Sequence, residues 1–263
     1  MTMGPITVDH QTPVATLTID RPRQRNAISF SMWHEMARVL RELDADQTVR
    51  AVVITGGGDQ AFSAGADIND FEEHRSDSTK GRQYNDAVNG LLATVVGMAT
   101  PTISMIRGFA VGGGCELAIA TDLRIAAHGS RFGIPVARLG ISIGHREMRG
   151  LVDLVGKGNA LYILLSGRLI DAQEAKEMGL VNQVVPPEEL EPVTYGLAQG
   201  IAALAPLSHA VNKLTLRQSL AKPDPASLNQ AEADLPLTQF DTEDYQEGYR
   251  AFLEKRPPKF TGK

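Results

Sequence analysis

The residues best suited to chemistry follow an apolar run that begins at Ile103 and breaks on three consecutive glycines. Gly112, Gly113 and Gly114 carry no Cβ atoms, so a ligand can lie against their backbone. A helix that begins there would present free N–H groups with a partial positive charge, and Glu116 falls in its first turn. Amide donors beside a carboxylate suit a reaction at a carbonyl compound, because the donors stabilise an oxyanion while the carboxylate moves a proton.

Alternating strands and helices must position these residues. An apolar run of strand length begins at Ile103, and others cover Ala51 to Thr55 and Leu123 to Ala127. Val14 to Asp20 alternates apolar and polar residues as a half-buried strand does, and Ile6 to Val8 is expected to pair with it antiparallel. Helical spacing predicts helices over 29–43 and 83–98, with a loop or short helix over 69–82. We expect a parallel sheet whose ligand site lies at the carboxyl ends of the strands, where 64–68 and 112–116 both fall.

The pattern becomes helical after Gly140. Helices are predicted over 148–155, 159–165, 172–178, 190–204, 208–220, 227–237 and 241–255. We therefore expect an α/β core over residues 1–200. A helical region over 201–263 would follow, either as a second domain or as an oligomer interface that also covers the active site.

Composition narrows the class of protein. The 263 residues are 43% hydrophobic, which is enough for a sizeable core. The formal net charge is −5, so the composition gives little support to a protein that binds nucleic acid. The single cysteine, Cys115, excludes an internal disulfide and suits a reducing compartment. Neither a signal peptide nor an apolar run long enough to span a bilayer is present, so we expect a cytoplasmic protein without a membrane partner.

Several motifs occur together in one order along almost the whole chain. They include Arg21-Pro22, Asn26-Ala27, Phe62 to Ile68, the Gly-Gly-Gly-Cys-Glu-Leu-Ala run ending at Ala118, Phe132-Gly133-Ile134-Pro135, Leu139-Gly140, Gly167-Arg168, Ala175 to Val181 and Thr242 to Gly248. This set resembles the crotonase superfamily, the enoyl-CoA hydratase/isomerase family. The resemblance implies a spiral of β-β-α repeats with a helical C-terminal region, and assembly into a homotrimer or a dimer of trimers.

The resemblance also implies an acyl-CoA thioester substrate, with coenzyme A entering only as part of that substrate and no separate cofactor. Its thioester oxygen would accept from the backbone N–H groups of Ala66 and Gly113, and Glu116 would act as general acid/base, in the hydration or dehydration of a 2-enoyl-CoA. The same resemblance assigns contacts with the substrate or its CoA to Arg23, Arg25, Ala64, Asp67, Ile68, Gly112, Val136 and Gly144. By its residue type, Asp67 also suits a cap of its own loop.

One position departs from the family pattern. Family hydratases use a second glutamate after Phe-Gly-x-Pro, and this chain has Val136 there. Three explanations remain open: Glu116 acts alone, as a hydratase or as a single-base isomerase; a neighbour such as His145 or Glu147 replaces the missing group; or the reaction is another, such as decarboxylation of a malonyl-type thioester.

Other function classes find less support. The missing glutamate would also fit a homologue that binds acyl-CoA without catalysis. An RNA-binding relative would need a stripe of basic residues, which this sequence lacks. The six histidines show no metal-ligand spacing, so we expect no metal site. Cys115 is expected to fill a small buried space. The glycines at 56–58 are not followed by the residues that complete a nucleotide-binding loop.

Overall fold

A computed structural model describes residues 2–263, and within them the larger sheet runs in the order β1–β2–β3–β4–β6–β8–β11. The strands β3, β4, β6, β8 and β11 are parallel, and β2 pairs antiparallel with β3 as predicted. The apolar sequences of β3, β4, β6 and β8 explain why these strands are buried on both faces. The bounds, in the order of the sheet, are Thr2–Met3, Ile6–Gln11, Val14–Ile19, Ala51–Gly56, Thr102–Ile106, Leu123–Ala127 and Gln183–Val185.

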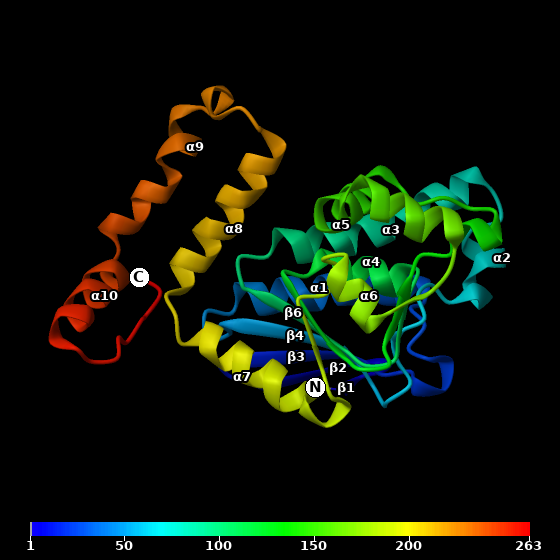
Figure 1. Cartoon of the computed structure of the whole chain (residues 1–263), viewed down its shortest axis with the longest axis horizontal. Coiled ribbons are helices and arrows are strands. Elements are labelled where there is room, and N and C mark those ends of the chain that lie inside the picture. The colour runs from blue at the N-terminus through cyan, green and yellow to red at the C-terminus, as the bar shows by residue number, and fades with distance from the viewer. Residues whose placement is uncertain (1) are drawn as a thin grey trace.

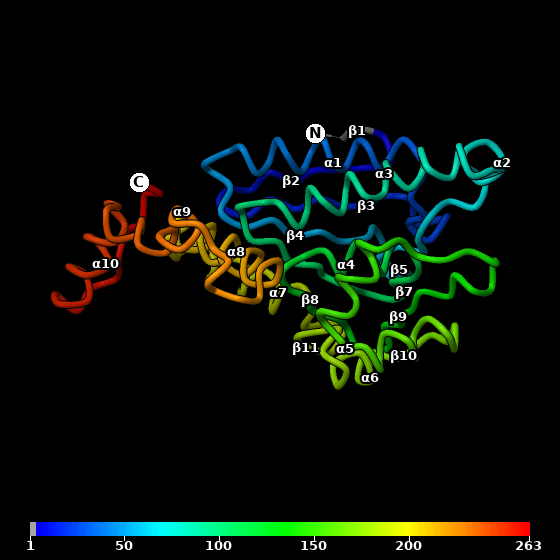
Figure 2. The backbone as a smooth tube through the Cα atoms, turned by 90° about the horizontal axis from the view of Figure 1, so that it is seen from above, coloured from blue at the N-terminus to red at the C-terminus, as the bar shows by residue number. Residues whose placement is uncertain are grey.

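A smaller sheet, in the order β10–β9–β7–β5, was not expected from the hydrophobic pattern. Its strands, β10 (Ile170–Asp171), β9 (Arg131–Gly133), β7 (Phe109–Val111) and β5 (Ala61–Ser63), are too short for a clear periodicity. Figure 2 shows β5, β7 and β9 grouped apart from β2, β3 and β4. Each of β4, β6 and β8 passes into a strand of the smaller sheet and then into a helix, which confirms the expected spiral of β-β-α repeats.

Helices cover the sheets and close the core (Figure 1). Helix α1 packs against α3, and α4 contacts both α3 and α5. Their apolar faces, with Trp33, Met36 and Leu40 of α1 fully buried, form the main hydrophobic cluster. The helices are α1 (Phe30–Ala45), α2 (Phe71–His74), α3 (Ser78–Gly97), α4 (Gly113–Ala120), α5 (His145–Ser166), α6 (Ala172–Glu177) and α7 (Leu190–Ala202).

Two helices are longer than predicted. Helix α3 begins at Ser78, where the Asp77 carboxylate accepts from the backbone N–H groups of Thr79 and Lys80. Short turns η2 (Ile68–Asp70) and α2 fill the segment before it. The helices predicted over 148–155 and 159–165 join into α5, which is interrupted only at Gly156 with φ of 74°.

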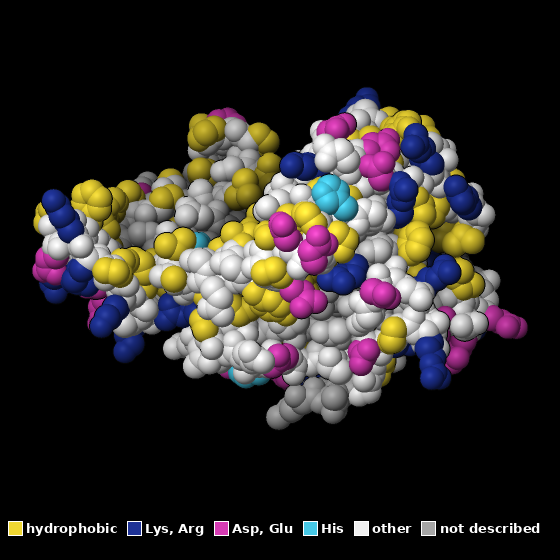
Figure 3. Space-filling model, turned by 60° about the horizontal axis from the view of Figure 1, so that its bottom comes forward, with side chains coloured by type: hydrophobic (Ala, Val, Ile, Leu, Met, Phe, Trp, Pro, Cys, Tyr) yellow, Lys and Arg dark blue, Asp and Glu magenta, His cyan; other side chains and the backbone are white. Residues whose placement is uncertain are grey.

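The C-terminal helices α8 (Pro206–Ala221), α9 (Gln230–Asp234) and α10 (Glu243–Glu254) extend away from the sheets as an arm (Figures 1 and 2). Lys213 of α8 connects the arm to the core, because its Nζ lies 2.6 Å from the Asp122 carboxylate and 3.0 Å from the Thr100 carbonyl oxygen. Figure 3 shows hydrophobic side chains at the surface of the arm. The large exposed ones are Leu214, Leu216, Leu220, Leu237, Phe240, Tyr245, Tyr249, Phe252 and Leu253.

No helix among residues 2–263 is both long enough and apolar enough to cross a bilayer.

The buried side chain of Asn26 holds the turn between β4 and β5, which leads into the 64–68 loop. Asn26 donates from Nδ2 to the carbonyl oxygens of Gly57 at 3.0 Å and Ala61 at 2.6 Å, and its Oδ1 accepts from the Arg21 N–H at 2.9 Å. The Ser63 hydroxyl donates to the Asn26 carbonyl at 2.8 Å. Asn26 also has a φ of 56°, which asparagine tolerates better than most residues. The side chain therefore connects η1 (Pro22–Gln24) to both ends of the β4–β5 turn.

We predict that Asn26→Ala lowers the free energy of unfolding by about 2–4 kcal/mol, because it leaves buried backbone groups without partners and puts alanine at a positive φ. Urea denaturation measures the change, with Gln24→Ala in the same exposed turn as the control. An Asn26→Ala midpoint equal to that of the control would show that these bonds do not hold the turn.

Candidate active site

A cleft of about 300 Å³ opens beside the N-terminus of α4. Its walls come from α1, the 64–68 loop, α2 and the residue after it, the first half of α3, the first turn of α4, and the segment from Pro135 to the start of α5. The lining residues are Trp33, Ala64, Ala66, Ile68, Phe71, Arg75, Tyr84, Asn85, Val88, Val111, Gly112, Gly113, Glu116, Pro135, Val136, Arg138, Leu139, Ile141, Ser142, Ile143, Gly144 and Glu147. The cleft thus brings together most of the residues that the sequence singled out.

Two backbone N–H groups that line the cleft have no acceptor within the described chain. In the 64–67 loop, the amides of Ala64, Gly65 and Asp67 donate to Arg25, Ser63 and Ile28, whereas Ala66 does not donate. Gly113 is the first residue of α4, so its N–H has no intrahelical acceptor. These two donors are free to bind an oxygen of a ligand.

Close packing brings the two donors together. A Cβ built on Gly65, whose φ is 94°, would lie 3.0 Å from the Gly113 nitrogen and 2.6 Å from the Val111 carbonyl oxygen. A Cβ on Gly113 would lie 3.7 Å from the Ala66 nitrogen but only 2.8 Å from the Trp33 ring. Both positions therefore require glycine, because a side chain at either one would push the loops apart.

Trp33 is itself held in place from the other side. Its indole Nε1 donates to the Tyr84 hydroxyl at 2.9 Å, and both side chains are buried. The bond connects α1 to α3 under the cleft. Desolvation in this position raises the pKa of Tyr84 to about 12, so the phenol stays neutral at physiological pH.

Glu116 extends from the first turn of α4 into the cleft and is half-buried. Burial raises its pKa to about 7, from an ordinary 4.5. The negative charge of Glu147 acts in the same direction, and the positive charge of Arg75 opposes both. A carboxyl group with a pKa near 7 can both accept and donate a proton at physiological pH, as a general acid/base requires.

Arg75 reaches the cleft from the end of α2. Its guanidinium carbon lies 4.6 Å from the centre of the Phe71 ring and 4.7 Å from that of Tyr84, within the range of cation–π attraction. The two rings therefore hold a positive charge on the wall shared with Glu116. Arg138, from η3 (Val136–Leu139), adds a second cation to the lining.

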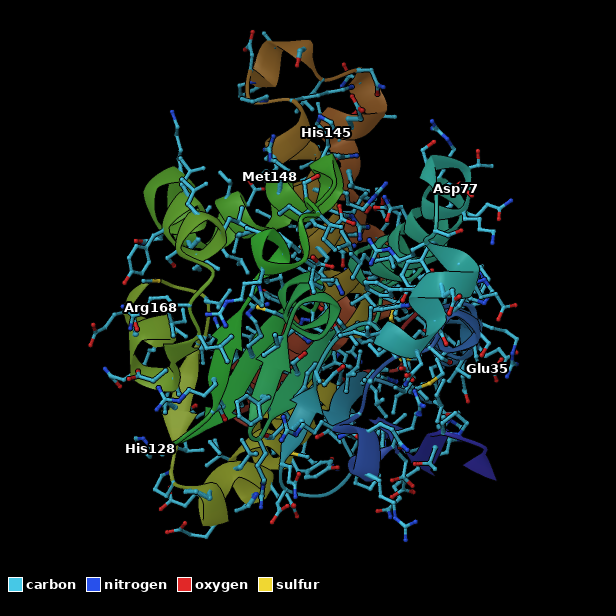
Figure 4. The ribbon with its side chains drawn as sticks, turned by 90° about the vertical axis from the view of Figure 1, so that its right-hand side faces the viewer. Glu35, Asp77, His128, His145, Met148 and Arg168 are labelled. Atoms are coloured by element: carbon cyan, nitrogen blue, oxygen red, sulfur yellow. The ribbon has the colours of Figure 1, made fainter. Side chains whose placement is uncertain are left out.

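Val136 lines the cleft and packs against the core, so an apolar side chain occupies the place of the second family glutamate. Glu147 lines the same cleft and is 8% exposed. His145 is exposed at the outer start of α5 (Figure 4) and is outside the lining. The structure therefore separates the two replacements considered from the sequence and brings only Glu147 to the site.

Three predicted contact residues lie outside the cleft lining. Arg23 and Arg25 are exposed on η1 and after it, and Arg25 stacks on the Phe109 ring at 5.7 Å. Asp67 pairs with Arg21 at 2.9 Å and accepts from the Asn69 N–H at 3.1 Å, as a cap of its loop does. Its carboxylate is thus already engaged within the protein.

Sequence reasoning missed the wall formed by α1, α2 and α3. Trp33, Tyr84, Phe71 and Arg75 meet at the site, but each belongs to a stretch that looks like an ordinary amphipathic helix or polar loop. No local signal in these stretches indicated the site. Cys115, in contrast, is buried as predicted, and desolvation raises its pKa to about 12, which keeps the thiol unreactive.

The fold and the site define a class of protein. Backbone donors beside a half-buried carboxylate, at the start of a helix in a β-β-α spiral, are the arrangement of a crotonase-superfamily enzyme. The model of the enoyl-CoA hydratase/isomerase family matches residues 9–263. This chain belongs to that family.

Relatives and solved structures cover the chain almost completely. A short-chain-enoyl-CoA hydratase of Clostridium acetobutylicum is 35% identical over 257 residues, covering 97% of each chain. A 2,3-dehydroadipyl-CoA hydratase of Escherichia coli is 36% identical over 261 residues, or 99% of this chain and 100% of the relative. The crystal structure of an enoyl-CoA hydratase/carnithine racemase from Magnetospirillum magneticum superposes with a TM-score of 0.95 at 35% identity, covering 100% of this chain and 97% of that one.

We predict that Glu116→Gln stabilises the free enzyme at alkaline pH. The raised pKa means that the folded state binds the Glu116 proton more tightly than the unfolded state, so this contribution to stability is complete below about pH 4.5 and is lost as the pH rises through about 7. A glutamine side chain does not titrate, so it adds no such pH dependence to the stability. The free energy of unfolding of the variant, relative to wild type, should therefore rise between pH 4.5 and pH 8, by on the order of 2–3 kcal/mol.

Urea denaturation at several pH values measures this difference, with Glu188→Gln at an exposed position as the control. A difference that stays constant across the range would show that Glu116 titrates normally.

Proposed function

We propose that this enzyme adds water to a 2-enoyl-CoA thioester, and removes it in the reverse direction, with Glu116 as general acid/base. The observation that carries the proposal is the pair of unpaired N–H groups, on Ala66 and Gly113, beside a carboxyl group with a pKa of about 7. Such donors suit a carbonyl oxygen that becomes negative during the reaction.

The chemistry uses that oxygen as an electron sink. With the thioester oxygen held by the two amides, electron density moves from the C2–C3 double bond toward it and makes C3 electrophilic. Water forms a C–O bond at C3 and loses a proton, while C2 gains a proton, so the sum of the reaction is the addition of one water molecule. The partial positive charge at the start of α4 supports the enolate-like intermediate.

The names of the relatives support the substrate class. The relatives are named as hydratases of a short-chain enoyl-CoA and of 2,3-dehydroadipyl-CoA. We propose an acyl-CoA thioester for this chain too, with Ala64, Ile68 and Gly112 against the substrate and Arg23, Arg25 or Asp67 near its CoA portion. Ile68 is 65% exposed at the rim of the cleft, as a residue that covers a ligand would be. Water is the only other reactant, so the proposed reaction needs no separate cofactor.

The valine at position 136 supports a second candidate. A single-base isomerase needs only one group that removes a proton from one carbon and returns it two carbons away, and a decarboxylase of malonyl-type thioesters needs mainly the oxyanion donors. Both keep the roles of Ala66 and Gly113. A protein that binds acyl-CoA without converting it is the remaining alternative.

We also propose that copies of the chain assemble, as a homotrimer or a dimer of trimers, in the cytoplasm. The apolar side chains on α8 to α10 support this, because exposed apolar groups on a projecting arm suit an interface.

We predict that Glu116→Gln lowers kcat/KM for hydration of trans-2-enoyl-CoA by a factor of about 10²–10⁴, the usual contribution of a general acid/base. Binding of the thioester, measured by calorimetry, should change little, since the amides remain. Glu35→Gln is the control, because Glu35 pairs with Arg38 on the outer side of α1 (Figure 4).

A panel of 2-enoyl-, 3-enoyl- and malonyl-type thioesters, with products identified by mass and double-bond position, separates the reactions. Hydration of the 2-enoyl thioester by wild type supports the proposal. Conversion restricted to the 3-enoyl or malonyl-type thioester would replace it with the second candidate. Binding without any conversion would indicate the non-catalytic alternative.

A further inference from the structure

We propose that Glu147 is the second carboxylate of the site, so that Glu116 and Glu147 act as a pair that shares one proton during hydration. This inference rests on the proposed function, because a second proton-carrying group is needed only if water is added. It gives the role of the missing glutamate at position 136 to a residue that lies on a different element, α5.

The placement of the Glu147 side chain is the first support. The residue is 8% exposed, yet it lines the cleft that Glu116 enters. Its Oε2 is buried and receives no hydrogen bond from any described residue. A buried carboxylate oxygen without a donor is costly, and such groups usually have a functional reason. A donor supplied by a ligand, such as the O–H of a substrate water, would satisfy it.

A structural role at the helix terminus does not account for this side chain. Glutamate at the third position of a helix often bonds back to the N–H of the N-cap residue in a capping box. Glu147 stands at that position with Gly144 as N-cap, but no such bond is formed, and glycine offers no side chain to complete the box. The carboxylate is instead buried toward the cleft.

Gly144 makes room for this arrangement. A Cβ built on Gly144 would lie 2.6 Å from the Glu147 Oε2, so any larger residue would displace the carboxylate. Gly144 also lines the cleft. The glycine that the family resemblance placed near the substrate therefore has a second role here, which is to accommodate the Glu147 carboxylate.

The charges around the pair are consistent with one shared proton. The ionisable groups that line the cleft with Glu116 are Glu147 from α5, Arg75 from the end of α2, Arg138 from η3 and the neutral Tyr84 from α3. Among these, Glu147 raises the pKa of Glu116 and Arg75 lowers it. Two carboxylates in one partly desolvated cleft resist being ionised together, so the charge of Glu147 favours the protonated form of Glu116.

The pair accounts for both proton transfers of hydration. Glu147 accepts a proton from water as the water oxygen bonds to C3, and Glu116 gives its proton to C2. One proton enters the pair and one leaves it, so the pair again carries one proton when the 3-hydroxyacyl product forms. No oxidant, metal or further reactant is needed.

Glu147→Gln tests the inference, because it keeps the size of the side chain and removes its proton transfer. We expect kcat/KM for hydration of trans-2-enoyl-CoA to fall by about 10²–10⁴. His145→Gln, on the same turn but outside the cleft, is the matched control and should behave as wild type. Near-ultraviolet circular dichroism and thermal unfolding verify that both variants are folded.

A second reaction separates catalysis from positioning. Exchange of the C2 protons of a saturated acyl-CoA with deuterium oxide requires only the oxyanion donors and Glu116. Glu147→Gln should therefore keep the exchange rate within a few-fold of wild type. In a plot of exchange rate against pH, the acidic limb should move to lower pH, because the pKa of Glu116 falls without the neighbouring charge. The double variant Val136→Glu with Glu147→Gln should recover part of the hydration, because it returns a carboxylate to the family position.

Three outcomes are decisive. Wild-type hydration by Glu147→Gln would overturn the inference and leave the proposed function intact. Loss of exchange in parallel with hydration would also overturn it, because Glu147 would then act only by placing Glu116. Wild type that catalyses neither reaction would overturn the proposed function itself.

Discussion

The close approach of two backbone segments is the constraint on which the rest of the structure depends. The loop at Gly65 and the helix start at Gly113 meet with room for a hydrogen but not for a methyl group, and Trp33 closes the space behind Gly113. The Trp33–Tyr84 bond joins α1 to α3 beneath this contact, while Asn26 holds the β4–β5 turn that leads into it. Much of the buried polar structure near the cleft thus holds two N–H groups a few ångströms apart.

The sequence predicted the parts of the site that depend on local backbone. Gly113 and Glu116 are adjacent in a recognisable strand-to-helix turn, and the resemblance supplied Ala66. The parallel strands were also predictable, because apolar runs such as 51–55 are long enough to indicate a buried strand. The short strands of the second sheet were not, since three residues define no period. Arg75 was not predicted, because it lies within 69–82, where no local pattern determines the path of the chain.

The proposed transfer of a role from position 136 to position 147 bears on why the departure from the family pattern was ambiguous in the sequence. In the sequence, a valine in place of a glutamate indicates a lost function, and a glutamate in the first turn of a helix indicates ordinary capping. In the structure both residues line one cleft, and only the buried position of Glu147 and its unpaired oxygen distinguish it from His145, which is exposed two residues earlier. Burial, not residue type, separated the two candidates.

The repeating order of strand, strand and helix has a consequence for how such a site can change. The segments that follow β5, β7 and β9 occupy equivalent places in successive repeats, and each contributes to the cleft: Ala66 after β5, Gly113 and Glu116 after β7, and Val136 with Glu147 after β9. In the proposed reaction, the first two repeats set where the carbonyl group is held, and the third supplies groups that decide which reaction follows. Substitutions in the third repeat would then change the reaction without moving the bound carbonyl group.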